Sequence, residues 1–96
     1  MIDDLIYCSD WKLYEEVKSA ITAAFPHAKI EDASDEVHRA RFSVSIAGID
    51  EKEYDKFVIK NHYLSLSFRL NLLFQDNIEH IRSLASDLGL IKTKLA

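Results

Sequence analysis

Few residues of this 96-residue sequence could carry out covalent chemistry, and a lone cysteine is the first of them. Cys8 is the only thiol and stands just before a predicted helix, whose N-terminus could favour the thiolate form. A nucleophilic cysteine also needs a neighbouring base, and no histidine stands in a recognisable arrangement with it. We therefore expect Cys8 to be a small, partly buried side chain rather than a nucleophile.

Metal and cofactor chemistry is equally weakly indicated. The chain has four histidines: His27, His38, His62 and His80. They form neither an H-E-x-x-H motif nor a zinc pattern of cysteines and histidines. The acidic run "EDASDEVH" could hold a divalent cation weakly, but it lacks the glycine and the final glutamate of a calcium-binding loop, so we expect a solvated acidic turn. Two glycines are too few for a phosphate-binding loop. The sequence predicts no cofactor, no metal site and no enzymatic activity.

Side chains suited to binding are better represented, beginning with the stretch "RARFSVSIA" at residues 39–47. Apolar residues occupy every second position, and two arginines and two serines lie between them, which is typical of a half-buried strand. If residues 54–60 and 63–74 are strands as well, the three segments carry five cations and one acid, whereas the other 15 of the 16 acids lie elsewhere. We predict a basic, serine-rich sheet face that binds a partner through these side chains: Arg39, Arg41, Tyr54, Lys56, Lys60, Tyr63 and Arg69. Trp11, at the start of the first helix, is a second candidate anchor.

The partner that best fits such a face is another protein with an acidic patch, because arginine can bind carboxylates through two hydrogen bonds. An inhibitor, an immunity-type protein or a chaperone-like adaptor would be of this kind. Nucleic acid is the alternative ligand, but two tyrosines form a thin stacking platform and the net charge is negative. A small-molecule-binding dimer is a further alternative. Two copies of a basic face repel each other, so we expect a monomer or a weak homodimer.

Length and composition limit the class of protein. Ninety-six residues with 48% apolar and 29% charged side chains predict one globular domain over residues 1–96. The formal net charge of −4 is modest. No apolar run approaches the length of a membrane-spanning helix, and the acidic start "MIDDLIYCSD" does not resemble a signal peptide. With a single cysteine, these features favour a cytoplasmic protein.

The elements that must position these residues begin with a helix. Ser9 or Asp10 can cap a helix that starts near Trp11 and ends before Pro26. Residues 28–32 and 37–47 then predict two strands joined by an acidic turn.

The second half of the chain is less uniform. Residues 50–62 fit a helix with a capping box or a strand, and the strand is favoured because it places apolar residues opposite apolar neighbours. The alternation in "YLSLSFRLNLLF" predicts a further strand over residues 63–74. Asp76 or Asn77 opens a last helix that ends at Gly89, and the tail from residue 90 to residue 96 adds a short strand or frays.

The resulting fold class is α+β, in two layers. An N-terminal helix, an antiparallel β-meander of three to four strands and a C-terminal helix follow one another, with one sheet face open to solvent. The alternative takes residues 4–8 as a strand and residues 50–61 as a helix. It gives a ferredoxin-like βαββαβ order with an added C-terminal helix.

Overall fold

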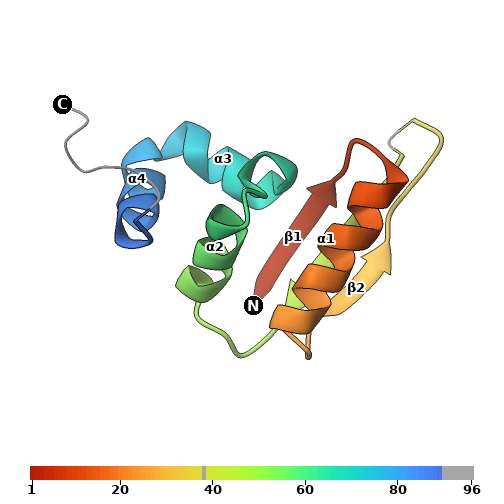
Figure 1. Ribbon diagram of the computed structural model, residues 1–96, viewed down its shortest axis with the longest axis horizontal. Coiled ribbons are helices and arrows are strands. Elements are labelled where there is room, and N and C mark those ends of the chain that lie inside the picture. Colours follow the sequence, from red (N-terminus) through yellow and green to blue (C-terminus); the bar gives the residue numbers. More distant parts are fainter. Residues whose placement is uncertain (38, 90–96) are drawn as a thin grey trace. The chain divides into compact units, whose positions relative to one another are not determined.

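The computed structural model describes residues 1–37 and 39–89, and it divides the chain into two compact units, Met1–Ile49 and Asp50–Ala96 (Figure 1). The described residues form four α-helices and a three-stranded antiparallel sheet, which confirms the predicted α+β class. The prediction of a single domain stays a prediction. The expectations for His38 and for the tail at 90–96 lie outside the described residues.

The first unit is a helix packed on one face of the sheet. Its elements are, in order, β1 (Ile2–Tyr7), α1 (Trp11–Ala24), β2 (Lys29–Asp32) and β3 (Arg41–Ile46). The strands are arranged as β1-β3-β2, so β3 is central and antiparallel to both neighbours. The N-terminal strand belongs to the alternative order, and the favoured meander lacked it.

Helix α1 is confirmed at both ends. The Asp10 side chain caps it by accepting a 2.8 Å hydrogen bond from the Leu13 amide, and the helix ends at Ala24, two residues before Pro26. Its buried side chains face the sheet, and the Tyr14 ring meets the Phe42 ring edge to face at a centroid distance of 5.3 Å. The alternation in β3 is also confirmed, because Phe42, Val44 and Ile46 are buried and the residues between them are partly exposed.

Strand β3 is shorter than the predicted strand over residues 37–47. Ala40 has a φ of 51°, in the left-handed region, so the extended strand begins only at Arg41. Arg39 and Arg41 therefore do not alternate along one strand. The Ala40 carbonyl nevertheless accepts a 2.9 Å hydrogen bond from the amide of Cys8, the residue that follows β1.

Replacing Ala40 by valine is expected to destabilise the protein by about 1–3 kcal/mol. A β-branched residue is strained at positive φ, and the Ala40 side chain is only 2% exposed, so added methyl groups have no room. Urea unfolding measures the loss. Ala40→Gly is the control, because glycine adopts this conformation freely and should stay within about 1 kcal/mol of the wild type. Equal stability of both variants would contradict the expectation.

The second unit is helical throughout its described part. It contains α2 (Glu51–Lys60), a 3₁₀ turn (Leu64–Leu66), α3 (Phe68–Asp76) and α4 (Ile78–Asp87). The predicted strands over residues 54–60 and 63–74 are therefore wrong. Asp50 caps α2 by accepting from the Lys52 amide, and Ser67 caps α3 by accepting from the Leu70 amide. These caps satisfy backbone donors that a strand would have paired with a neighbouring strand.

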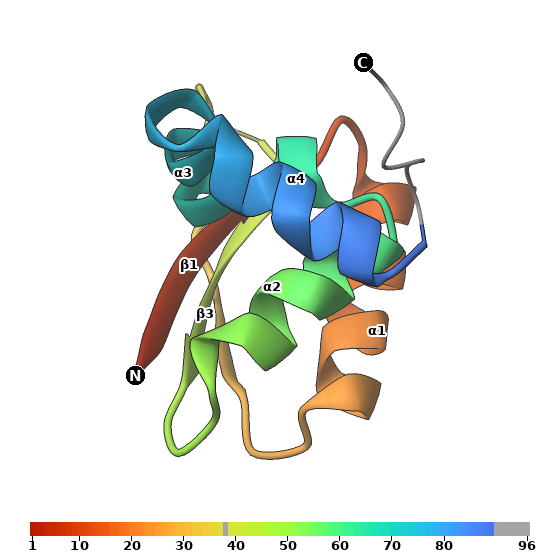
Figure 2. The ribbon, with the colours of Figure 1, turned by 90° about the vertical axis from the view of Figure 1, so that its left-hand side faces the viewer.

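The predicted C-terminal helix is confirmed as α4. The Asn77 side chain accepts from the His80 amide, and Gly89 has a φ of 71° just after the helix, the conformation of a glycine C-cap. The buried face of α4 contains Ile81, Leu84 and Ala85. Within this unit α4 contacts both α2 and α3, and Figure 2 shows α2 and α4 side by side. The final strand of the ferredoxin-like alternative does not occur among the described residues.

Candidate functional site

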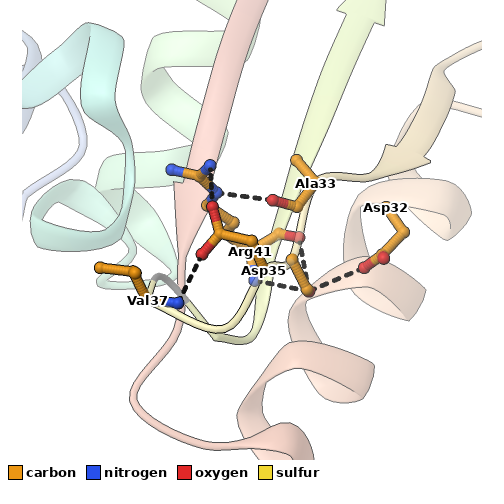
Figure 3. Close-up of polar contacts among 6 residues, drawn as sticks. Asp32, Ala33, Asp35, Val37 and Arg41 are labelled. Atoms are coloured by element: carbon orange, nitrogen blue, oxygen red, sulfur yellow. Dashed lines mark hydrogen bonds and ion pairs between the residues drawn. The ribbon is translucent and has the colours of Figure 1, made fainter.

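Arg41 is held inside the first unit and does not project from an open basic face. Its Nε donates to the Ala33 carbonyl at 2.6 Å, and its Nη2 lies 2.9 Å from Asp35 Oδ2 (Figure 3). Its guanidinium also lies 5.8 Å from the centre of the Tyr7 ring. Through these contacts Arg41, at the start of β3, holds the residues that follow β2 in place.

The same loop is tied down by two further carboxylate contacts. The Ser34 hydroxyl donates to Asp32 Oδ1 at 2.8 Å and lies 3.2 Å from the Arg41 amide, from which it accepts. Asp35 Oδ1 accepts from the Val37 amide at 2.9 Å (Figure 3). Sequence reasoning identified this acidic turn but missed the pairing of Asp35 with Arg41. These hydrogen bonds therefore hold residues 32–37 in place against Arg41.

The open sheet face is mixed in charge, which corrects the predicted basic face. The register places Asp3 and Lys29 on either side of Ser45, and Leu5 and Glu31 on either side of Ser43. Ser45 Oγ donates to Asp3 Oδ1 at 3.0 Å. The acids come from β1, which the favoured meander lacked, and from β2, which the meander correctly placed beside β3.

Stability of this unit is expected to fall in acid through Asp32. The Tyr14 hydroxyl, 2.6 Å away, and then Ser34 lower the pKa of Asp32 from its ordinary 3.8. A carboxyl group of this kind stabilises the fold above its unfolded-state pKa, and the contribution is lost as the pH falls through the lower folded-state value. We expect Tyr14→Phe to be less stable than the wild type by a constant amount between pH 7 and 5, and by a smaller amount below pH 3.8. Urea unfolding across this range measures the difference; a gap that persists unchanged at pH 2 would contradict it.

A shallow open hollow lies beside the fixed loop. It has a volume of about 450 Å³ and is lined by residues from the start of α1 and from the loop: Trp11, Ser34, Asp35, Glu36 and Arg39. Trp11 is 50% exposed, and its ring packs edge to face on Tyr14 at 5.0 Å. No carboxylate in the described part of the chain forms an ion pair with Arg39, whereas Asp35 is already paired with Arg41. The structure thus brings two predicted anchors, Trp11 and Arg39, to one hollow.

Arg69 has a structural position in the second unit. Its Nη1 binds Oδ1 of Asp55, whose side chain is 2% exposed, and its Nη2 lies 3.4 Å from Glu51 Oε2. His80 Nε2 lies 3.9 Å from the other oxygen of Asp55. The helical turn from Glu51 to Asp55 places both carboxylates on the same side of α2. Arg69 was predicted to face outward from a strand, but in α3 it compensates a buried charge.

The other predicted binding residues also lie in the second unit, on or beside α2. Tyr54 is fully buried, so it offers no surface to a partner. Lys56 and Tyr63 are partly exposed and Lys60 is exposed. Because residues 54–60 form a helix and not a strand, these side chains do not extend a sheet face as predicted.

Cys8 is expected to react slowly with alkylating reagents. Its partial burial, and then the charge of Asp10, raise the pKa of the thiol from 9.0 to about 11. Thiolate is the reacting form, so iodoacetamide at pH 7 should modify the folded protein about a hundredfold more slowly than the same protein unfolded in urea. Mass spectrometry of timed samples gives both rates. Equal rates would show that the thiol is accessible and ionises normally.

Other kinds of site are not found in the described ranges. Between residues 1 and 37 and between 39 and 89, no three histidine, cysteine or acidic side chains are grouped closely enough to hold a metal ion. Over the same ranges no helix has the length and apolar character needed to cross a membrane. Compared with protein-family models, with curated proteins and with solved structures, the chain shows no significant match. Inference about function therefore rests on the geometry alone.

Proposed function

We propose that this chain is a non-enzymatic interaction module that binds a protein partner through the hollow between Trp11 and Arg39. The observation that carries the proposal is a half-exposed tryptophan and an arginine that line one hollow, where the arginine has no carboxylate partner among the described residues. Tryptophan and arginine contribute most often to the binding energy of protein interfaces. The hydrogen bonds of the loop support it further, because a fixed loop loses little conformational entropy on binding.

The chemistry of the hollow suggests what the partner presents. The indole of Trp11 offers an apolar surface, and the guanidinium of Arg39 can bind a carboxylate through two hydrogen bonds. Glu36 lines the same hollow, so a dense acidic patch would be repelled. We therefore propose that the partner inserts an apolar side chain against Trp11 and a single carboxylate near it.

Nucleic acid is less well supported as the ligand. Of the three arginines that were to form a basic face, Arg41 and Arg69 are engaged by carboxylates within their own units. A nucleic-acid site needs several cations along one groove, and Arg39 alone does not supply them.

Selection of displayed random peptides on the purified protein tests the proposal. We expect enriched peptides with an apolar residue next to an aspartate or glutamate. Binding of a synthetic peptide should weaken at least about thirtyfold for Trp11→Ala, because exposed interface tryptophans contribute about 2 kcal/mol or more. Arg39→Glu should weaken it as well, whereas Arg39→Lys should retain part of the affinity.

The matched control is Lys60→Ala, which alters an exposed cation of the second unit and should leave peptide binding unchanged. Circular dichroism confirms that the variants are folded. Enriched peptides that bind the wild type and Trp11→Ala equally well would overturn the proposal. So would a selection that enriches no sequence.

A further inference from the structure

The hollow beside Trp11 is lined by two carboxylates that differ in their surroundings. Asp35 Oδ2 lies 2.9 Å from Arg41 Nη2, so the charge of Asp35 is compensated within the first unit. Glu36 lines the same hollow and is exposed. Among the described residues, no cation forms an ion pair with Glu36. Of the two carboxylates, Glu36 therefore carries the charge that a bound partner would meet uncompensated.

Arg39 brings the opposite charge to this hollow. It stands three positions after Glu36 and is exposed as well, but the two side chains do not form an ion pair with each other. Within the part of the chain that the structure describes, the hollow thus combines one uncompensated cation, one uncompensated anion and the half-exposed ring of Trp11. A ligand that complements it fully carries both signs of charge.

We infer that Glu36 is a second recognition group of this hollow, and that the partner segment carries a lysine or arginine as well as the carboxylate bound by Arg39. The inference rests on the proposed function, because it concerns the same hollow. A segment with both charges meets an opposite charge at each position, whereas a purely acidic segment meets Glu36 with a like charge. Like charges opposite each other suppress wrong partners, so Glu36 contributes to specificity more than to affinity.

The tryptophan supports the same preference. Trp11 is 50% exposed, and the face of an exposed indole attracts an ammonium or guanidinium group. The alkyl stem of a lysine or arginine also packs against apolar surface while its charged end stays in water. A cation bound at Glu36 remains partly hydrated, so its contribution is modest and decreases with salt.

A charge-swap selection tests the inference. The probe is a displayed peptide library that fixes a leucine beside an aspartate, in either order, and leaves the flanking positions random. On the wild type we expect lysine and arginine to be enriched at one flanking position. On Glu36→Lys the same position should favour aspartate and glutamate, and on Glu36→Gln it should show no charge preference.

Fluorescence anisotropy of labelled synthetic peptides measures the size of the preference. One peptide carries lysine at the selected position and the other carries glutamate. The wild type should bind the lysine peptide about fivefold more tightly, and Glu36→Lys should prefer the glutamate peptide by a similar factor, because one exposed ion pair replaces one like-charge contact. Both preferences should shrink in about 0.5 M NaCl.

Glu16→Lys is the matched control. It makes the same change in net charge at an exposed position of α1 that does not line the hollow, so it should keep the wild-type preference. Circular dichroism establishes that each variant is folded. If Glu36→Lys does not fold, Glu36→Gln decides the same question through loss of the preference.

The outcomes separate this inference from the proposed function. Peptides that require Trp11 but show the same charge preference on the wild type and on both Glu36 variants would overturn the inference and leave the proposed function intact. A preference that Glu16→Lys reverses as fully as Glu36→Lys would overturn it as well, because net charge would then be the cause. If no peptide binds in a way that depends on Trp11, the inference and the proposed function are both wrong.

Discussion

Arg69→Met is expected to destabilise the protein by about 3–5 kcal/mol, the loss typical of breaking a buried ion pair by removing one partner. The variant leaves the carboxylate of Asp55 in place, with 2% of its side chain exposed and without the guanidinium that binds it. Such a loss lowers the melting temperature by roughly 12–40 °C for a chain of this size. Thermal and urea unfolding followed by circular dichroism measure it.

A double variant separates the buried charge from lost packing. Asp55→Asn combined with Arg69→Met removes both charges, so it should recover part of the stability that Arg69→Met loses. Arg82→Met, an exposed position on α4, is the matched control and should change stability by less than about 0.5 kcal/mol. If the double variant is no more stable than Arg69→Met, the ion pair is not the source of the loss.

Phe42→Ala is expected to cost about 3–5 kcal/mol through the cavity that it leaves in the first unit. Phe42 is 0% exposed on the central strand, and it packs edge to face on Tyr14. Phe42→Leu should cost less, because most of the volume is kept. A loss for Phe42→Ala no larger than that for Phe42→Leu would contradict this account of the core.

Unfolding of Arg69→Met also tests the prediction that residues 1–96 form one domain. Each unit spans fewer than about 50 residues, a size at which a hydrophobic core alone is marginally stable, so we expect both to unfold in one transition. The single tryptophan, Trp11, reports on the first unit by fluorescence, and circular dichroism is sensitive to the helices of the second. Arg69→Met should shift both signals by the same amount. A shift in circular dichroism alone would show that the units unfold independently.

The helices with clear end signals were predictable from the sequence. Asp10 and Pro26 mark α1, and Asn77 and Gly89 mark α4, because capping side chains and backbone-restricting residues act locally. The central strand was predictable in type from its alternation. Its start was not, because nothing in the sequence indicates that Ala40, rather than a glycine, adopts a left-handed conformation.

The strands predicted over residues 54–60 and 63–74 were wrong for a physical reason. Leucine and phenylalanine at every second position fit a strand, but positions 68 and 72 also lie on one side of a helix. The helix leaves Phe68 and Leu72 exposed, which a prediction that buries every apolar residue does not anticipate. Asp50 as a helix cap was recognised as an alternative. The cap at Ser67 was the signal that could have identified α3.

The candidate site was predictable only in part. Trp11 and Arg39 could be named from residue type, but their common hollow depends on the turn at Ala40 and on the pairing of Arg41 with Asp35. Ion pairs between distant residues, such as Arg69 with Asp55, leave no periodic pattern in a sequence. The three arginines predicted to form one basic face therefore have different surroundings: Arg39 lines the hollow, Arg41 pairs with Asp35, and Arg69 pairs with Asp55 and Glu51.

The strand order has a consequence for synthesis of the chain. Strand β1 pairs with β3, Ile2 opposite Ile46, so its partner is translated long after it. At roughly 5–20 residues per second, β1 waits a few seconds on the ribosome with its apolar side chains unpaired. Asp3 and Asp4 stand directly after Ile2, and charges beside an apolar strand act as gatekeepers against aggregation. We therefore expect the acidic start of this strand to limit aggregation of the nascent chain until β3 has been translated.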